Sequence, residues 1–185
     1  LSEGGLGFSF KWNMGWMHDN LAFFREEPEH RKWHFDKATF AMVYHYDENF
    51  MLALSHDEVV HLKGSLFGKM PGNAWQRLAN LRLLFGYQWT FPGKPLLFMG
   101  GEFGQADEWS ENRQIDWTLT ESESSNRGVQ LWLADLNRVY RAESALWEAD
   151  YDKVGFQWVN CHDRDFSVLS FLRRNKSETE TLLVV

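Results

Sequence analysis

The residues most able to do chemistry follow a single apolar run. Ser55, His56 and Asp57 come directly after residues 49–54, a near-continuous apolar stretch. A histidine can donate a hydrogen bond to a hydroxyl group, and a carboxylate can accept one or stabilise positive charge on an oxocarbenium-like carbon. The same residues would also fit a structural cap before a loop, and their spacing alone leaves both interpretations open.

Two other catalytic arrangements of this segment are disfavoured by spacing. His56, His61 and the distant His45 match no His-Glu-x-x-His pattern, so we expect no metal site. A Ser-His-Asp triad would need Ser55 and His56 on one face, but neighbouring residues of a strand point to opposite faces. Cys161, the single cysteine, is expected to be a partly buried free thiol rather than a nucleophile.

Composition narrows the function classes further. The net charge is −7 and no basic run exceeds Arg173-Arg174, so we expect no nucleic acid partner. No stretch approaches the roughly 18 apolar residues of a membrane span, so we expect no membrane partner. The start of the sequence has no charged-then-apolar pattern, so we expect no signal segment. The lack of disulfides predicts a cytoplasmic protein. The aromatic share of 16% suits core packing, and its surplus suits stacking on sugar rings or bases.

Apolar and amphipathic segments alternate before about Asp150. The expected elements are strands at residues 7–13, 49–54 and 95–99 and helices at residues 18–25, 38–44, 74–89 and 128–143. Successive strand–helix units imply a parallel sheet, which a doubly wound fold or a (β/α)8 barrel would provide. A long polar loop at residues 106–126 follows a strand, which favours the barrel, whose sites lie at the carboxyl ends of its strands.

After about Asp150 the pattern changes. Short apolar segments at residues 155–159, 167–173 and 182–185 are separated by polar turns, which is typical of antiparallel β structure. We therefore predict a domain boundary near Asp150.

Four stretches resemble the motifs of a known family. They are KWNMGWMHD at residues 11–19, LSHDEVVH at 54–61, KMPGNAWQ at 69–76 and LLFMGGEFGQ at 96–105. The pairs Glu108-Trp109 and Asp116-Trp117 follow in the same order. From Gly5 to Arg174, the chain resembles the 1,4-α-glucan (glycogen) branching enzymes of the α-amylase superfamily.

The resemblance implies an α/β fold and an activity. Residues 1–150 would form the second half of a (β/α)8 TIM barrel, about strands six to eight with their helices. Residues 151–185 would begin an all-β C-terminal domain. The implied enzyme is a glycosyltransferase of glycogen synthesis that cleaves an α-1,4-glucan and re-attaches it through an α-1,6 branch by a retaining double displacement. Its implied partners are α-1,4-glucan chains such as glycogen and amylose, and it implies no cofactor.

The resemblance also implies roles for single residues. Asp57 would stabilise the transition state, and His56 would hydrogen-bond the same sugar. Trp12, Trp109 and Trp117 are candidates for stacking on glucan rings, and packing of loops against the barrel explains each of them at least as well.

Two family carboxylates have no counterpart in this sequence. They are the nucleophilic Asp of a Gly-x-Arg-x-Asp-Ala motif and the general-acid Glu of the preceding strand. Glu58 should project away from Asp57, which it directly follows, and Glu102 is expected to order loops. We therefore expect the chain alone to be inactive. Leu62 stands where the family usually has glycine, which predicts a slightly stiffer loop and nothing worse.

The ends suggest a fragment, because the chain begins at Leu1 and stops on an apolar run at residues 181–185. Its partners would be the remainder of its own barrel and N-terminal domains. Open strand edges then predict a poorly soluble or partly molten chain.

One alternative is an α-glucan hydrolase of the same superfamily, an amylase or a trehalose-releasing enzyme, which residues 11–17 and 70–76 disfavour. The other is a non-catalytic glucan-binding fragment.

Overall fold

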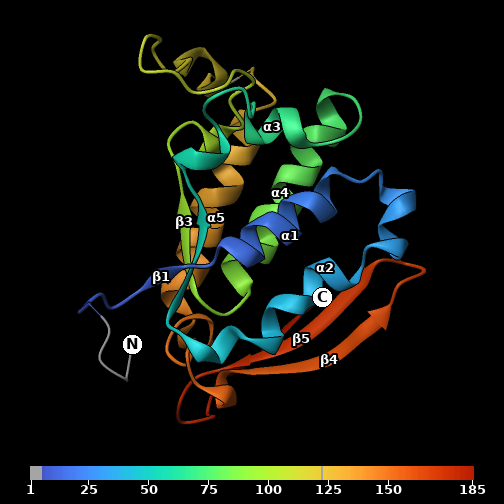
Figure 1. Cartoon of the computed structure of the whole chain (residues 1–185), viewed down its shortest axis with the longest axis vertical. Helices are drawn as coiled ribbons and strands as arrows, with labels where there is room; N and C mark the ends of the chain where they lie inside the picture. The colour runs from blue at the N-terminus through green and yellow to red at the C-terminus, as the bar shows by residue number, and fades with distance from the viewer. Residues whose placement is uncertain (1–5, 122) are drawn as a thin grey trace.

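The computed structural model describes residues 6–121 and 123–185, so Gly5, where the family resemblance begins, lies outside the described residues (Figure 1). The strands are β1 Lys11–Trp12, β2 Phe50–Leu54, β3 Lys94–Leu97, β4 Phe156–Asp163, β5 Val168–Arg174 and β6 Thr181–Val184. The α-helices are α1 Met14–Arg25, α2 Asp36–Thr39, α3 Leu66–Lys69, α4 Ala74–Thr90 and α5 Arg127–Ala142. The 3-10 helices are η1 Pro28–Trp33, η2 Phe40–Val43, η3 His45–Asp47, η4 His56–Glu58, η5 Gly101–Phe103, η6 Trp117–Thr120, η7 Ser144–Leu146 and η8 Lys153–Gly155.

The first three strands form a parallel sheet with β2 in the centre. Lys11 pairs with Phe50, and Leu54 pairs with Leu97. The central strand is apolar along its whole length and mostly buried, as a strand covered on both faces should be. Because helical segments separate the parallel strands, the predicted α/β class is confirmed.

Helix α4 anchors this sheet. Its start is a capping box, in which Asn73 Oδ1 accepts the Gln76 N–H and Gln76 Oε1 accepts the Asn73 N–H. Near its end the buried side chain of Gln88 donates from Nε2 to Leu52 O (2.8 Å) and Leu96 O (3.0 Å). One amide therefore bridges β2 and β3, and the helix predicted at residues 74–89 is confirmed.

A buried ion cluster ties the second, antiparallel sheet (order β4-β5-β6) to the first. Arg173 of β5 is fully buried, with Nη2 2.6 Å from Asp150 Oδ1 and Nη1 donating to Thr90 O at the end of α4. Lys94 of β3 places Nζ 2.7 Å from the other oxygen, Asp150 Oδ2. Figure 1 shows β4 and β5 at the opposite end of the molecule from residues 106–121. The boundary near Asp150 stays a prediction.

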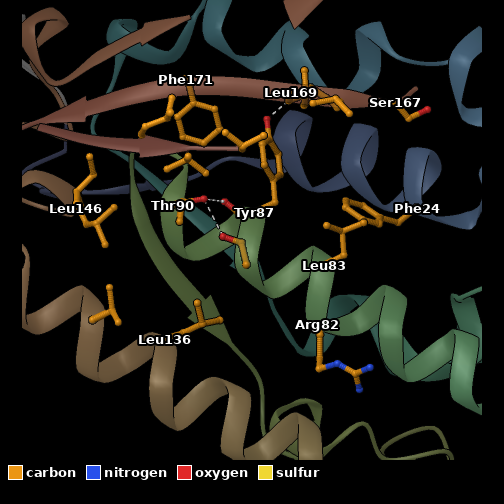
Figure 2. Close-up of a pocket in the computed structure, with 18 of the residues that line it drawn as sticks. Phe24, Arg82, Leu83, Tyr87, Thr90, Leu136, Leu146, Ser167, Leu169 and Phe171 are labelled. Atoms are coloured by element: carbon orange, nitrogen blue, oxygen red, sulfur yellow. Dashed lines mark hydrogen bonds between the residues drawn. The ribbon is translucent and has the colours of Figure 1, made fainter. Parts of the chain in front are cut away.

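An apolar groove of about 790 Å³ separates helices α4 and α5 from strands β5 and β6. Figure 2 shows Leu83 and Tyr87 of α4, Leu136 of α5, and Leu169 and Phe171 of β5 lining it. The antiparallel sheet is held to α4 near the ion cluster and by the contact of Tyr87 with Phe171, whose ring centroids lie 6.4 Å apart.

Three expectations about elements were wrong in detail. The strand expected at residues 7–13 is only Lys11–Trp12, because only these residues pair with β2. The segment at residues 38–44 divides between α2 and the 3-10 helix η2. The third strand, expected to be buried on both faces over residues 95–99, is half-buried and ends at Leu97, because within the described residues β3 lies at the edge of its sheet.

Candidate functional site

The carboxyl ends of the three parallel strands lie together, and a ring side chain follows or ends each one. Trp12 ends β1, His56 follows β2, and Phe98 follows β3. The His56 ring centroid lies 6.3 Å from that of Trp12 and 5.9 Å from that of Phe98. Parallel strands place their carboxyl ends at one edge of a sheet, so residues far apart in sequence converge here.

Asp57 lies in the 3-10 turn η4, which Ser55 caps. The Ser55 hydroxyl accepts the Asp57 N–H at 3.3 Å, so the cap interpretation of this segment is confirmed and the chemical interpretation stays a prediction. His56 Nε2 lies 3.3 Å from Asp57 Oδ1, and the two side chains are 53% and 46% exposed. Because the carboxylate is open to solvent, it can meet a ligand that approaches this edge of the sheet.

Glu58 points elsewhere, as its place next to Asp57 predicts. Its side chain is only 8% exposed and its Oε1 lies 3.6 Å from Lys63 Nζ. Glu102 lies half-buried in η5, and its role in ordering loops stays a prediction.

The three candidate tryptophans differ in their surroundings. Trp12 is partly exposed, at 38%, and lies edge-on to His56. Trp109 is half-buried and packs edge-on against Phe98, with ring centroids 5.5 Å apart. Trp117 is well exposed and contacts Phe103, which places it outside this cluster of rings.

Phe98 joins Trp109 to His56, and the sequence did not single it out. It was assigned to the interior of a strand at residues 95–99, where an apolar side chain needs no further explanation. The signal that could have identified it is its place directly after β3, at the sheet edge where Trp12 and His56 also lie.

The loop at residues 58–64 follows the site without regular structure beyond η4. Two of its residues that are not glycine have left-handed backbones, His61 (φ 56°) and Leu62 (φ 68°). This conformation crowds the Cβ of any residue other than glycine. The expectation for Leu62, a stiffer loop and nothing worse, was therefore incomplete, because the backbone there is also strained.

Two charged side chains hold this loop through its backbone. Lys69 Nζ donates to the carbonyls of Glu58, Lys63 and Gly64, and burial lowers the pKa of Lys69 to about 8. The Glu108 carboxylate accepts the Gly64 and Leu62 N–H groups, and these hydrogen bonds lower its pKa. Both residues lie in stretches that carry the family resemblance, but neither pattern nor spacing reveals that their side chains bind distant backbone groups.

No cluster of three or more His, Cys, Asp or Glu side chains suited to a metal occurs among residues 6–121 and 123–185. His45 lies in the core, where its Nε2 is 2.8 Å from Asp150 O and burial lowers its pKa. Cys161 is a half-buried free thiol, as expected. No helix in the described part of the chain has the length and apolar character of a membrane span.

Comparison with known proteins adds a second kind of observation. No protein-family model matches the chain. The 1,4-alpha-glucan branching enzyme of Aquifex aeolicus is 58% identical over 182 residues, which is 98% of this chain and 29% of that enzyme. The Rubrobacter xylanophilus enzyme is 55% identical over 98% of this chain and 25% of its own length. The Aromatoleum aromaticum enzyme is 53% identical over 100% of this chain and 29% of its own length.

The chain is homologous to one segment of the 1,4-α-glucan branching enzymes. The resemblance found in its motifs is therefore confirmed, and the chain spans about 29% of the length of the Aquifex aeolicus enzyme. Three of the branching-enzyme motifs lie around the site described above. Residues 11–19 run from β1 into α1, residues 54–61 hold η4 and its loop, and residues 96–105 include Phe98.

Proposed function

We propose that this chain contributes the Asp57 part of the active site to a 1,4-α-glucan branching enzyme. Such an enzyme cleaves an α-1,4-glucan and joins the released segment to a 6-hydroxyl by a retaining double displacement. The observation that carries the proposal is the half-exposed Asp57 carboxylate beside His56, at the carboxyl end of the central parallel strand. The homology to branching enzymes over 98% of the chain supports the reaction class.

The architecture we propose is the second half of a (β/α)8 barrel in residues 1–150, followed by the start of an all-β domain in residues 151–185. The parallel order β1-β2-β3 and the helices after these strands support the barrel. The antiparallel order β4-β5-β6 supports the second domain. The remaining barrel strands and the N-terminal domains would then be partners of this chain, in the cytoplasm.

Each site residue has a proposed task. The Asp57 anion stabilises the positive charge that develops at the sugar carbon during cleavage, and His56 donates a hydrogen bond to a hydroxyl of the same sugar. Trp12, Trp109 and Trp117 offer aromatic faces or edges to further glucan units. The nucleophile and the acid/base come from the remainder of the barrel, so the 185 residues alone are inactive.

The test is a chimera of the Aquifex aeolicus branching enzyme in which this chain replaces the homologous segment. Amylose is the substrate, and iodine colour and reducing ends are followed together. Transfer lowers the iodine colour without new reducing ends, whereas the hydrolase alternative raises the reducing ends. Asp57→Asn should lower the rate about 10²–10³-fold, the loss typical of one electrostatic group in an active site. An Asp57→Asn chimera as fast as its parent would refute the proposal.

The non-catalytic alternative has its own outcome. A chimera that binds amylose but shows neither transfer nor hydrolysis would favour a glucan-binding role for this segment.

A further inference from the structure

Lys69 fills a cage of backbone carbonyls directly behind the candidate site. Its Nζ donates to Glu58 O at 2.6 Å, Lys63 O at 2.6 Å and Gly64 O at 3.0 Å, which uses every N–H of the ammonium group. The residue is only 8% exposed. The ammonium therefore serves the loop at residues 58–64 rather than the solvent.

Glu108 holds the same loop from its other side. Its Oε1 accepts the Leu62 N–H at 3.0 Å and its Oε2 accepts the Gly64 N–H at 2.6 Å. A third link lies beside it, where the Trp109 N–H donates to Val59 O at 3.0 Å. Lys69 binds the carbonyls of the loop and Glu108 binds its amides, so the two side chains complement each other.

This support matters because part of the loop has a strained backbone. His61 and Leu62 have left-handed backbones, which cost free energy in residues other than glycine, and Gly64 also has a positive φ. The Glu58 carbonyl that Lys69 binds belongs to the residue next to Asp57. Glu58 is also the last residue of η4, the turn that carries the Asp57 side chain.

We infer that Lys69 and Glu108 are positioning residues that fix the loop at residues 58–64 and, through it, the Asp57 carboxylate. The inference rests on the proposed function, because it assigns Asp57 to the transition state. A displaced Asp57 would lower the rate of the chemical step more than the binding of glucan, because the stacking contacts proposed for the tryptophans would remain. A loss of stability alone would not lower the rate of the chemical step while leaving the binding of glucan unchanged.

The experiment compares three variants of the chimera. Lys69→Met removes the ammonium and keeps an apolar stem of similar length, and Glu108→Gln places an amide N–H group against a backbone N–H. Each should lower kcat for amylose about 10- to 100-fold with KM unchanged, as expected when a catalytic group shifts by about 1 Å. Lys176→Met, an exposed lysine on a turn, is the matched control and should keep the parent kcat.

A pH profile gives a readout that a merely structural role would not move. Arg25, Glu58, Lys63 and Glu108 interact electrostatically with Lys69, whose pKa of about 8 is the result mainly of burial. Asp107 lines the adjoining surface, and His61 faces Glu108. Above pH 8 a neutral amine keeps only two N–H groups for three carbonyls. The parent kcat should fall as pH rises through about 8, and this limb should be absent in Lys69→Met.

The outcomes separate the two proposals. Parent kcat in both Lys69→Met and Glu108→Gln, with Asp57→Asn inactive, would overturn the positioning role and leave the proposed function in place. Parent kcat in Asp57→Asn would overturn the proposed function whatever Lys69 does. If Lys69→Met does not fold, Glu108→Gln decides, because the Glu108 side chain is only partly buried and its replacement has the same size.

Discussion

The indole of Trp12 meets the imidazole of His56 edge-on, with ring centroids 6.3 Å apart and ring planes at 74°. The two residues end or follow neighbouring parallel strands, so the pairing of β1 with β2 sets this contact. Phe98 contacts the imidazole from the third strand. His56 is therefore in contact with rings from both neighbouring strands and with Asp57, whose Oδ1 lies 3.3 Å from its Nε2.

Removal of the Trp12 ring should disturb His56. An aromatic pair contributes about 0.5–1.5 kcal/mol beyond area burial, so Trp12→Leu in the chimera should lower kcat/KM for amylose about two- to ten-fold. Trp75→Leu is the matched control, because Trp75 is exposed at the start of α4, outside the ring cluster. Equal kinetics for both variants would show that Trp12 has no part in the site.

Leu62 should be replaceable by glycine with a gain in stability. Its φ of 68° strains any side chain, and at 99% exposure it has almost no packing to lose. Leu62→Gly should raise the free energy of unfolding by about 0.5–1 kcal/mol, since the relief of about 1–2 kcal/mol is partly offset by the flexibility that glycine adds to the unfolded chain. Leu62→Ala keeps the strained backbone and should show no gain in urea unfolding.

The buried ion pair of Asp150 and Arg173 should be costly to break. Asp150→Asn leaves Arg173 and Lys94 beside a neutral amide, and a buried charge without its partner costs about 3–5 kcal/mol. The exposed pair of Asp135 and Arg138 provides the comparison, and Asp135→Asn should change stability by less than about 0.5 kcal/mol. Similar losses in the two variants would contradict this ranking.

His45 should make stability depend on pH. Burial lowers its pKa below the ordinary value of 6.5, so the folded chain holds it neutral while the unfolded chain takes up a proton. The contribution of His45 to stability should therefore be constant above about pH 6.5 and fall as pH decreases below it, until the folded pKa is reached. His45→Gln should flatten this slope in urea unfolding, whereas the exposed His30→Gln should retain it.

Sequence patterns predicted some elements well and others poorly, for physical reasons. The helix at residues 74–89 and the strand at residues 49–54 have strong periodicity and clear end signals, and both are present in the structure. The first strand was overestimated, because its aromatic content suggested pairing beyond Lys11–Trp12. The third strand is half-buried rather than buried, because an apolar run does not reveal whether its strand has a neighbour on both sides.

The candidate site was predicted only where a motif or a strand end marked it. His56 and Asp57 stand directly after an apolar run, so their place at the sheet edge followed from the alternation of elements. Phe98, Lys69 and Glu108 also lie in stretches that carry the family resemblance, but those stretches alone assign none of them a role at the site. Their contacts depend on backbone atoms and rings that are distant in sequence, and these become visible only once the loop geometry is known.

The carbonyl cage around Lys69 also limits how this position can evolve. A tetrahedral ammonium can direct its hydrogens to three converging oxygens, whereas the planar guanidinium of arginine directs them within one plane. Lys69→Arg would therefore preserve the charge but would not fit the three converging carbonyl oxygens. We therefore do not expect arginine to replace lysine at position 69, even though the exchange would keep the positive charge.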